Sequence, residues 1–232
     1  MDFEKLLDPF KLVASALKGI VNAFKAWRGF RLVIFGTTRV GKTTLWQYLQ
    51  TQKVVDPKAI EKTFEITKLE KFRLKTIRLT GVRTAILATD LPGDKQFRHT
   101  WPEVLNAVKP HGIIFLLDNV EDPAKVPDTG YDEKRLLEHR EAFDYLTGLI
   151  MSEPEVQESL QAMAIVVNKS DTFPKTLGYG KILEKSQIST SFSQYNELEK
   201  CRSTVFSCSA LYGHNVPTMI RWMVKSMAGD NE

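Results

Sequence analysis

Residues 36–43 read GTTRVGKT, a loop in which two glycines precede a lysine and a threonine. Gly36 and Gly41 allow a tight turn whose N–H groups converge on phosphate. Lys42 adds a positive charge, and the hydroxyl of Thr43 is a suitable ligand for Mg²⁺. The apolar run FRLVIF precedes the loop and the helix-forming run TLWQYLQ follows it, so the order strand, loop, helix predicts a phosphate-binding loop. We expect its contacts to come from Gly36, Thr37, Thr38, Arg39, Val40, Gly41, Lys42, Thr43 and Thr44.

A second polar motif, NKSD (168–171), comes at the end of another apolar run. The carboxylate of Asp171 can accept two hydrogen bonds from the N1–H and N2–H₂ edge of guanine, whereas adenine offers no such pair of donors. The stem of Lys169 can lie over the base, and Asn168 can tie this loop to the phosphate loop. The later dipeptide Ser209-Ala210 can present its backbone to the base O6. These residues favour guanine and disfavour an ATP-using enzyme.

The elements that must position these loops are short apolar runs separated by helical patterns, which predicts an α/β fold with a parallel sheet covered on both faces. The expected strands are 30–35, 84–90, 112–118, 163–168 and 203–208. The expected helices are about 43–51, 100–109, 132–151 and 216–227. Residues 64–79 lead into the strand at 84–90 with the spacing of an antiparallel hairpin, so we expect a mixed six-stranded sheet with one antiparallel edge strand. Pro154 marks a helix break, and residues 172–200 are expected to be a loop with a short helix.

Composition narrows the class of protein. The chain has 232 residues, of which 43% are hydrophobic, which suits one globular domain with an appendage. A net charge of +4 is mild, so we expect no nucleic-acid partner. Two cysteines without a disulfide framework favour a cytoplasmic chain, and the lack of a run of 18 uncharged apolar residues predicts no spanning helix. Neither the two cysteines nor the four histidines show metal-ligand spacing, and we expect ordinary roles for Cys201, Cys208, His99, His111, His139 and His214.

The motifs GTTRVGKT, DLPG (90–93), NKSD and Ser209-Ala210 occur in the order and with the spacing of small Ras-like GTPases, which the chain resembles over about residues 30–227. The segment from Asp90 to Trp101 is most similar to the Arf branch and to the β subunit of the signal-recognition-particle receptor, which also carry an Arg and a Trp at these offsets. The resemblance implies a three-layer P-loop GTPase fold. It also implies binding of GTP or GDP with Mg²⁺, and a molecular switch that acts through protein effectors or regulators.

The same resemblance assigns the metal site. It implies that Asp90 holds Mg²⁺ through water and that the Gly93 N–H senses the γ-phosphate. The family also uses a loop threonine just before the second strand, a position that both Thr63 and Thr67 fit. Thr63 is preferred because the strand alternation begins directly after it. The expected metal-binding set is Thr43, Thr63 and Asp90.

The hydrolytic residue departs from the family pattern. Ras and Arf have Gln immediately after the DxxG glycine, and that Gln orients the attacking water. Here Asp94 stands at that position and Gln96 comes two residues later, so these two are the candidate catalytic residues. Arg39 can either help to neutralise phosphate or point to solvent, and Arg98 is expected to be structural. We expect slow intrinsic hydrolysis that needs a partner. The rival hypothesis is a pseudo-GTPase scaffold that binds GTP structurally and works through protein–protein interaction.

Residues 1–28 are expected to be an amphipathic leading helix, and residues 29–232 the GTP-binding domain. Between residues 9 and 28, apolar side chains recur at intervals of three and four and form one helical face. Lys11, Lys18 and Lys25 flank that face. Such a helix can lie in a membrane interface, contact a partner protein or pack on its own domain, and the residues leave these three alternatives open.

Overall fold

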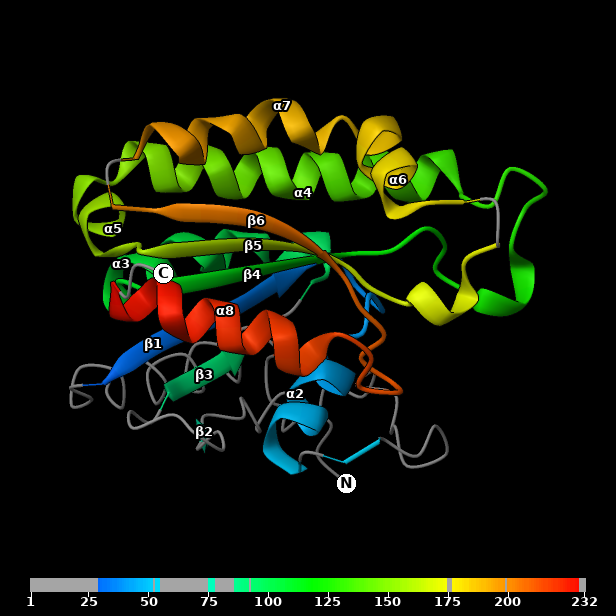
Figure 1. Ribbon diagram of the computed structural model, residues 1–232. Coiled ribbons are helices and arrows are strands. Elements are labelled where there is room, and N and C mark those ends of the chain that lie inside the picture. The colour runs from blue at the N-terminus through cyan, green and yellow to red at the C-terminus, as the bar shows by residue number, and fades with distance from the viewer. Residues whose placement is uncertain are drawn as a thin grey trace, which may run out of the picture.

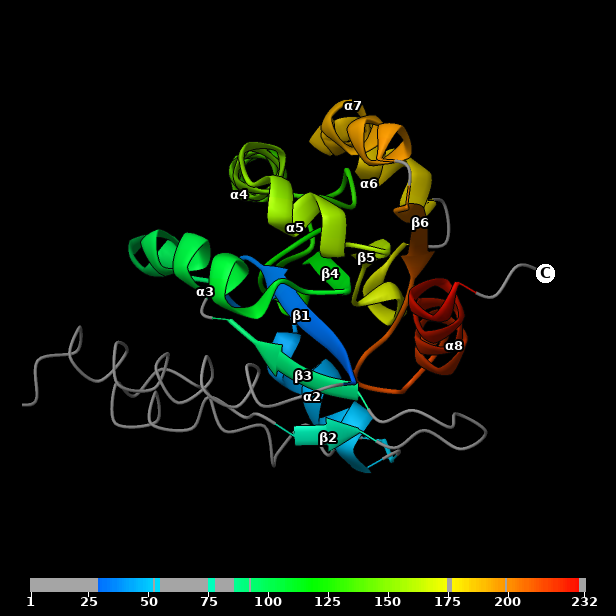
Figure 2. The same cartoon turned by 90° about the vertical axis from the view of Figure 1, so that its left-hand side faces the viewer.

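The computed structural model describes residues 29–51, 53–54, 75–77, 86–91, 93–174, 177–198 and 200–229. The predicted leading helix and both candidate switch threonines, Thr63 and Thr67, lie outside these residues. In the described part of the chain, a twisted sheet lies between two layers of helices (Figures 1 and 2).

The sheet has six strands in the order β2-β3-β1-β4-β5-β6. All neighbours are parallel except β2, which pairs antiparallel with β3 at the edge, as the predicted hairpin requires. Every residue of β4 and β5 is buried, because helices cover both faces there. The strands are β1 (Phe30–Gly36), β2 (Lys75–Ile77), β3 (Ile86–Asp90), β4 (Gly112–Leu117), β5 (Ala162–Val167) and β6 (Arg202–Ser207). The predicted α/β fold with a parallel sheet is confirmed.

The helices divide between the two faces of the sheet. On one face lie α3 (Trp101–Val108), α4 (Glu133–Ser152), α5 (Pro154–Ser159), α6 (Tyr179–Ser186) and α7 (Ile188–Phe192); on the other lie α2 (Lys42–Thr51) and α8 (Val216–Ala228) (Figure 2). Strand β1 supplies both cores, because successive side chains of a strand point to opposite faces. Val33 and Phe35 belong to the first core, and Leu32 and Ile34 belong to the second. Short 3₁₀ helices are η4 (Lys95–Thr100), η5 (Pro123–Lys125), η6 (Ser170–Thr172) and η7 (Ser193–Glu197).

Helix α4 has clear start and stop signals. The carboxylate of Asp132 accepts hydrogen bonds from the backbone N–H groups of Lys134 at 2.9 Å and Arg135 at 3.2 Å, which caps the helix. The helix ends at Ser152, and Pro154 begins α5, so the predicted break is confirmed.

The segment at 172–200 is more helical than the sequence predicted. It forms α6, α7 and η7 where we expected a loop with one short helix, so that prediction is wrong. Three widely spaced apolar side chains, Ile182, Ile188 and Tyr195, are fully buried in the core that α4 shares. Leu183, Phe192 and Leu198 also pack against this core, and the polar residues between these apolar side chains mask the helical pattern.

The parallel strands bring the candidate site together. Because β1, β3, β4, β5 and β6 all run in one direction, the loops that follow them emerge at the same edge of the sheet. The sequence motifs in the described residues follow β1, β3, β5 and β6, and none of them follows β4. The loop after β4 carries polar residues that the sequence analysis did not single out.

Candidate nucleotide-binding site

The GTTRVGKT loop joins β1 to α2 and has the backbone of a phosphate-binding turn. Gly36 and Gly41 have φ angles of +145° and +95°, which favour glycine. Lys42 is only 8% exposed. Its Nζ donates to the carbonyls of Gly36 at 3.0 Å and Thr37 at 2.6 Å, so the loop wraps around the lysine. The ammonium group is thereby held at the N-terminus of α2, where the helix dipole also favours an anion.

Close packing also requires the two loop glycines. A Cβ at Gly36 would lie 2.6 Å from the carbonyl oxygen of Leu116, and a Cβ at Gly41 would lie 2.3 Å from Asn168 Nδ2. Both distances are shorter than any real contact of a Cβ. The glycines therefore allow the loop to approach the strands and loops beside it as well as to turn.

Asn168 links the phosphate loop to two other loops. Its Nδ2 donates to the Val40 carbonyl at 2.8 Å, and its Oδ1 accepts from the Ala210 N–H at 2.9 Å. The side chain is 2% exposed, and buried hydrogen bonds of this kind are strongly directional. The predicted tie between Asn168 and the phosphate loop is confirmed, and the same amide also fixes the Ser209-Ala210 loop.

Asp171 lies in η6 and is exposed. No ion pair of its carboxylate is found among the residues that the structure describes, which leaves its oxygens available as acceptors. It lines a pocket of about 620 Å³ together with Ser209, Tyr212 and His214. Two of the residues expected to recognise the base therefore border one hollow.

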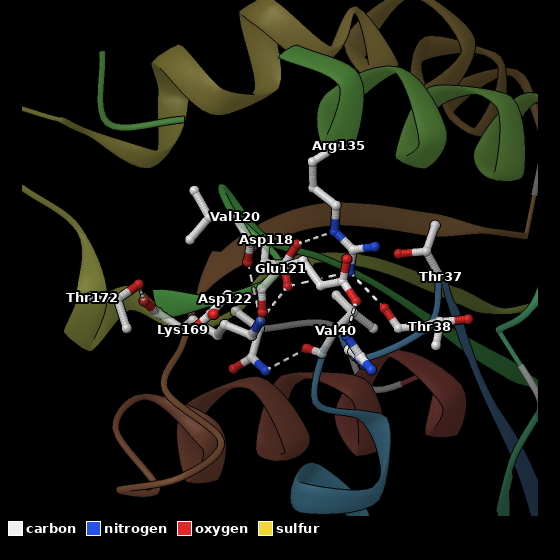
Figure 3. Close-up of polar contacts among 12 residues, drawn as sticks. Thr37, Thr38, Val40, Asp118, Val120, Glu121, Asp122, Arg135, Lys169 and Thr172 are labelled. Atoms are coloured by element: carbon white, nitrogen blue, oxygen red, sulfur yellow. Dashed lines mark hydrogen bonds and ion pairs between the residues drawn. The ribbon is translucent and has the colours of Figure 1, made fainter. Parts of the chain in front are cut away.

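A buried polar cluster lies behind these loops, and the sequence analysis missed most of it. We define the Asp118 cluster as Asp118, Arg135, His139 and Lys169. Asp118 is the first residue after β4, and its carboxylate accepts from Arg135 Nε at 2.8 Å, from His139 Nε2 at 2.8 Å and from Lys169 Nζ at 2.7 Å. Figure 3 shows Arg135 reaching from α4 toward Asp118 and Thr38. His139, which we predicted to be an ordinary polar residue, is fully buried in this cluster.

The charges of the Asp118 cluster stabilise one another. Burial alone raises the pKa of Asp118, but the hydrogen bond from His139 and the charges of Arg135 and Lys169 outweigh it and hold the pKa well below its usual range. Burial lowers the pKa of His139, which keeps the imidazole neutral. Burial also opposes the charge of Arg135, but the adjacent Asp118 carboxylate dominates and raises its pKa. The cluster therefore contains one anion, two cations and a neutral histidine.

The DLPG segment meets the phosphate loop directly. Asp90 ends β3 beside Ile34, and the Leu91 N–H donates to the Ile34 carbonyl at 3.1 Å. A Cβ at Gly93 would lie 2.4 Å from Lys42 Nζ and 2.4 Å from the Gly36 carbonyl, so only glycine fits this approach. The backbone of Gly93 therefore lies against the residues expected to bind phosphate. The Asp90 side chain lies outside the described residues.

The two candidate catalytic residues have surface positions. Asp94 caps η4, and its carboxylate accepts from the backbone N–H of Gln96 at 3.1 Å. The Gln96 side chain is exposed. Arg98 in the same 3₁₀ helix is partly buried; burial lowers its pKa, and the negative charges of Glu141 and Glu138 on α4 act in the opposite direction.

The side chain of Arg39 forms an ion pair at the surface. Its guanidinium pairs with Glu121 at 2.6 Å, and both side chains are about half exposed. Of the two alternatives that the sequence left open for Arg39, the structure shows the one in which its side chain lies at the surface. The backbone of Arg39 has a φ of +58°, a conformation in which a residue other than glycine is uncommon.

Of the expected metal-binding residues, Thr43 is the one whose side chain the structure describes. It follows Lys42 in the first turn of α2, and its side chain is partly buried. In the part of the chain that the structure describes, no group of three His, Cys, Asp or Glu side chains could hold a metal by itself. A Mg²⁺ ion that took phosphate oxygens and water as its other ligands would not need such a group.

No described helix combines the length and the apolar character needed to cross a membrane.

The phosphate loop, the glycine of DLPG and the asparagine-anchored base loop, set at the ends of parallel strands, define the P-loop GTPase fold. The model of the ADP-ribosylation factor family matches residues 17–227. The chain belongs to the ADP-ribosylation factor family of small GTPases. Family membership implies guanine-nucleotide binding and a capacity for GTP hydrolysis.

Known proteins of the family match most of the chain. ADP-ribosylation factor-related protein 1 of Rattus norvegicus is 26% identical over 197 residues, which cover 84% of this chain and 83% of the relative. ADP-ribosylation factor-like protein 3 of Saccharomyces cerevisiae is 26% identical over 211 residues, 90% of each chain. Among solved structures, the Arl6 BBS3 small GTPase from Trypanosoma brucei with bound GppNp has a TM-score of 0.60 at 17% identity. That similarity covers 87% of this chain and 99% of that one, and it supports the fold.

Proposed function

We propose that this chain is a Mg²⁺-dependent, GTP-binding molecular switch with slow intrinsic hydrolysis. The observation that carries the proposal is the pair of hydrogen bonds made by the Asn168 amide, which donates to the phosphate loop at Val40 and accepts from the base-side loop at Ala210. This link supports the proposal because it ties the loops expected to bind phosphate and base together at one edge of the sheet.

The residues fit a nucleoside di- or triphosphate. Buried Lys42, the loop N–H groups and the N-terminus of α2 would hold the phosphates. The approach of Gly93 to Lys42 places its backbone where it can sense a terminal phosphate. Thr43, with Asp90 and Thr63, would hold Mg²⁺, which when bound neutralises phosphate charge. The exposed carboxylate of Asp171 would accept from guanine, with Lys169 over the base and Ser209-Ala210 near O6.

Slow hydrolysis is proposed from the local contacts of Asp94. This residue stands where the related GTPases have Gln, and its carboxylate already accepts from the backbone of Gln96. A carboxylate also adds negative charge near the terminal phosphate, where a neutral amide would not. Protein partners that complete the site would then set the rate of the switch.

Asp94 also favours a second candidate function, a pseudo-GTPase scaffold. In that case the chain would bind GTP tightly without turning it over, and the nucleotide would stabilise a surface for protein partners.

Single-turnover hydrolysis of Mg²⁺–GTP by the purified protein separates these two functions. A switch converts bound GTP to GDP slowly but completely, whereas a scaffold retains GTP. We expect Asp94→Gln to hydrolyse GTP about tenfold or more faster than the unmodified protein, because it supplies the amide that orients water. Asp94→Asn is the matched control, because it retains the helix cap and removes the charge but is too short to take the same position. Equal rates for all three proteins would contradict the assignment of Asp94.

Residues 9–28 are proposed to contact a membrane surface at its cytoplasmic face. Full-length protein should then sediment with anionic vesicles, and a truncated chain beginning at Arg28 should not. Added salt should weaken the binding without abolishing it, because lysine charges and inserted apolar side chains both contribute. A full-length protein that fails to sediment with GDP and with a non-hydrolysable GTP analogue would contradict the membrane proposal.

A further inference from the structure

The Asp118 cluster forms a continuous set of contacts between the two sides of the proposed nucleotide site. Two side chains that contact the Asp118 carboxylate also contact the phosphate loop. His139 Nδ1 lies 3.0 Å from Thr37 Oγ1, and Arg135 Nη2 donates to the Thr38 carbonyl at 2.6 Å. A third contact joins Asp118 to the base loop, because Lys169 of that loop contacts the carboxylate through its Nζ.

The protonation state of His139 follows from its contacts with the ionised Asp118 carboxylate, which can only accept, and with the Thr37 hydroxyl; the Asp118 backbone N–H also lies near Nε2, at the longer distance of 3.2 Å. The Asp118 carboxylate lies 2.8 Å from Nε2, so Nε2 carries the proton and donates it. A neutral imidazole then has Nδ1 free to accept from the Thr37 hydroxyl. His139 therefore orients both Asp118 and Thr37.

Lys169 is also braced by the backbone of the loop after β4. Its Nζ donates to the carbonyls of Val120 at 3.1 Å and Glu121 at 2.9 Å (Figure 3). With Asp118, these acceptors satisfy all three donors of the ammonium group. The position of Lys169 therefore depends on this loop, which holds the phosphate loop as well.

The location of the cluster argues against a purely structural role. Asp118 and His139 are fully buried and Arg135 is 4% exposed, and burying such charges carries a large desolvation cost. Farther along the same helix, α4 packs on the sheet through Phe143, Leu146 and Ile150 without charges. Apolar packing is thus sufficient to hold α4 on the sheet. Among the described residues of α4, the buried charged contacts, those of Arg135 and His139 with Asp118, lie at the end of the helix that meets the proposed nucleotide loops, whereas the pairs of Arg140 and Glu141 are at the surface.

We propose that Asp118 and Arg135, oriented by His139, are positioning residues that couple recognition of the phosphates to recognition of the base. They act through Thr37, Thr38 and Lys169. Loss of the cluster would let the phosphate loop and the base loop take up independent positions, so a ligand that needs both would lose the most affinity. This inference rests on the proposed guanine-nucleotide site.

The test compares the affinities of GDP and GMP in variants of the cluster, with active protein counted by nucleotide titration so that unfolded molecules do not contribute. Arg135→Gln should raise the Kd of GDP by about 30-fold and that of GMP by only about 3-fold, because GMP makes fewer phosphate contacts. Arg135→Lys retains the charge but loses the forked contact, so it should lie between. Asp118→Asn should resemble Arg135→Gln.

The matched control is Arg140→Gln on the same helix. Arg140 is exposed and pairs with Asp144 at 3.5 Å, away from the cluster. Its loss should change neither Kd by more than about twofold.

The possible results distinguish failure of the positioning role from failure of the proposed nucleotide site. If the unmodified protein binds GDP but the cluster variants keep its ratio of GMP to GDP affinity, the positioning role is wrong and the nucleotide site stands. Variants that are all unfolded, with Arg140→Gln folded, would make the cluster a structural element and would also overturn the proposal. If the unmodified protein binds neither nucleotide, the proposed function itself fails.

Discussion

The loops that surround the proposed nucleotide site and the segment after DLPG, residues 93–101, are held in different ways. The phosphate and base loops are joined by buried, directional contacts through Asn168 and the Asp118 cluster. Segment 93–101 is held mainly by the burial of Phe97 and Trp101, and Trp101 packs edge-on against Phe35 with ring centroids 4.9 Å apart. The hydrogen bonds of Asp94 with Gln96 and of Thr100 with Phe97 are local, and the pair of Lys95 with Glu141 is at the surface.

The difference bears on which part of the site can move. Buried ion pairs tolerate little displacement, because separating them leaves an unpaired charge at a cost of about 3–5 kcal/mol. Burial of aromatic side chains is less directional, and an exposed pair such as Lys95 with Glu141, 3.4 Å apart, contributes about 0–1 kcal/mol. The loops around the proposed nucleotide site are therefore built to keep their positions. Segment 93–101 is suited to the rearrangement that a switch requires.

The largest effect is expected at the phosphate loop. Lys42→Ala removes a buried charge with charged hydrogen bonds, so it should weaken Mg²⁺–GTP binding by at least about 3 kcal/mol, more than a hundredfold. Thr43→Ala should weaken it in the same direction by removing a metal ligand. Equilibrium titration with a fluorescent GTP analogue measures both variants. Unchanged affinity in both would remove the phosphate-loop assignment.

The smallest effect is expected in segment 93–101, where Lys95→Ala is the matched lysine control. Lys95 is exposed and pairs only across the surface, so its loss should change GTP affinity by less than about twofold and the free energy of unfolding by less than about 1 kcal/mol. An effect as large as that of Lys42→Ala would contradict the comparison of the two regions.

The sequence predicted the strands and the main helices because their apolar runs are short, continuous and bounded by turns. Asn168 was also predictable, since a buried amide between two loops needs partners on both. The helical content of 172–200 was not, because the fully buried side chains Ile182, Ile188 and Tyr195 are widely spaced and polar residues separate them.

The Asp118 cluster was missed for a different reason. Arg135 and His139 lie on a charged helix, and their burial depends on how α4 is placed over the sheet, which no local pattern records. Asp118 did carry a signal, because a carboxylate at the end of a buried strand needs a partner.

Competition binding at Asp171 tests the central claim, a guanine-nucleotide site built from these loops, most directly. In the unmodified protein, GDP should displace a fluorescent GDP analogue at far lower concentration than ADP. Asp171→Asn should raise the Kd of GDP by about 30-fold to 150-fold, since a donor replaces one of two charged acceptors. Xanthosine diphosphate, which has a carbonyl in place of the 2-amino group, should gain affinity in that variant. The exposed position of Asp171 predicts that the fold is unaffected. Equal displacement by ADP and GDP in the unmodified protein would contradict the account.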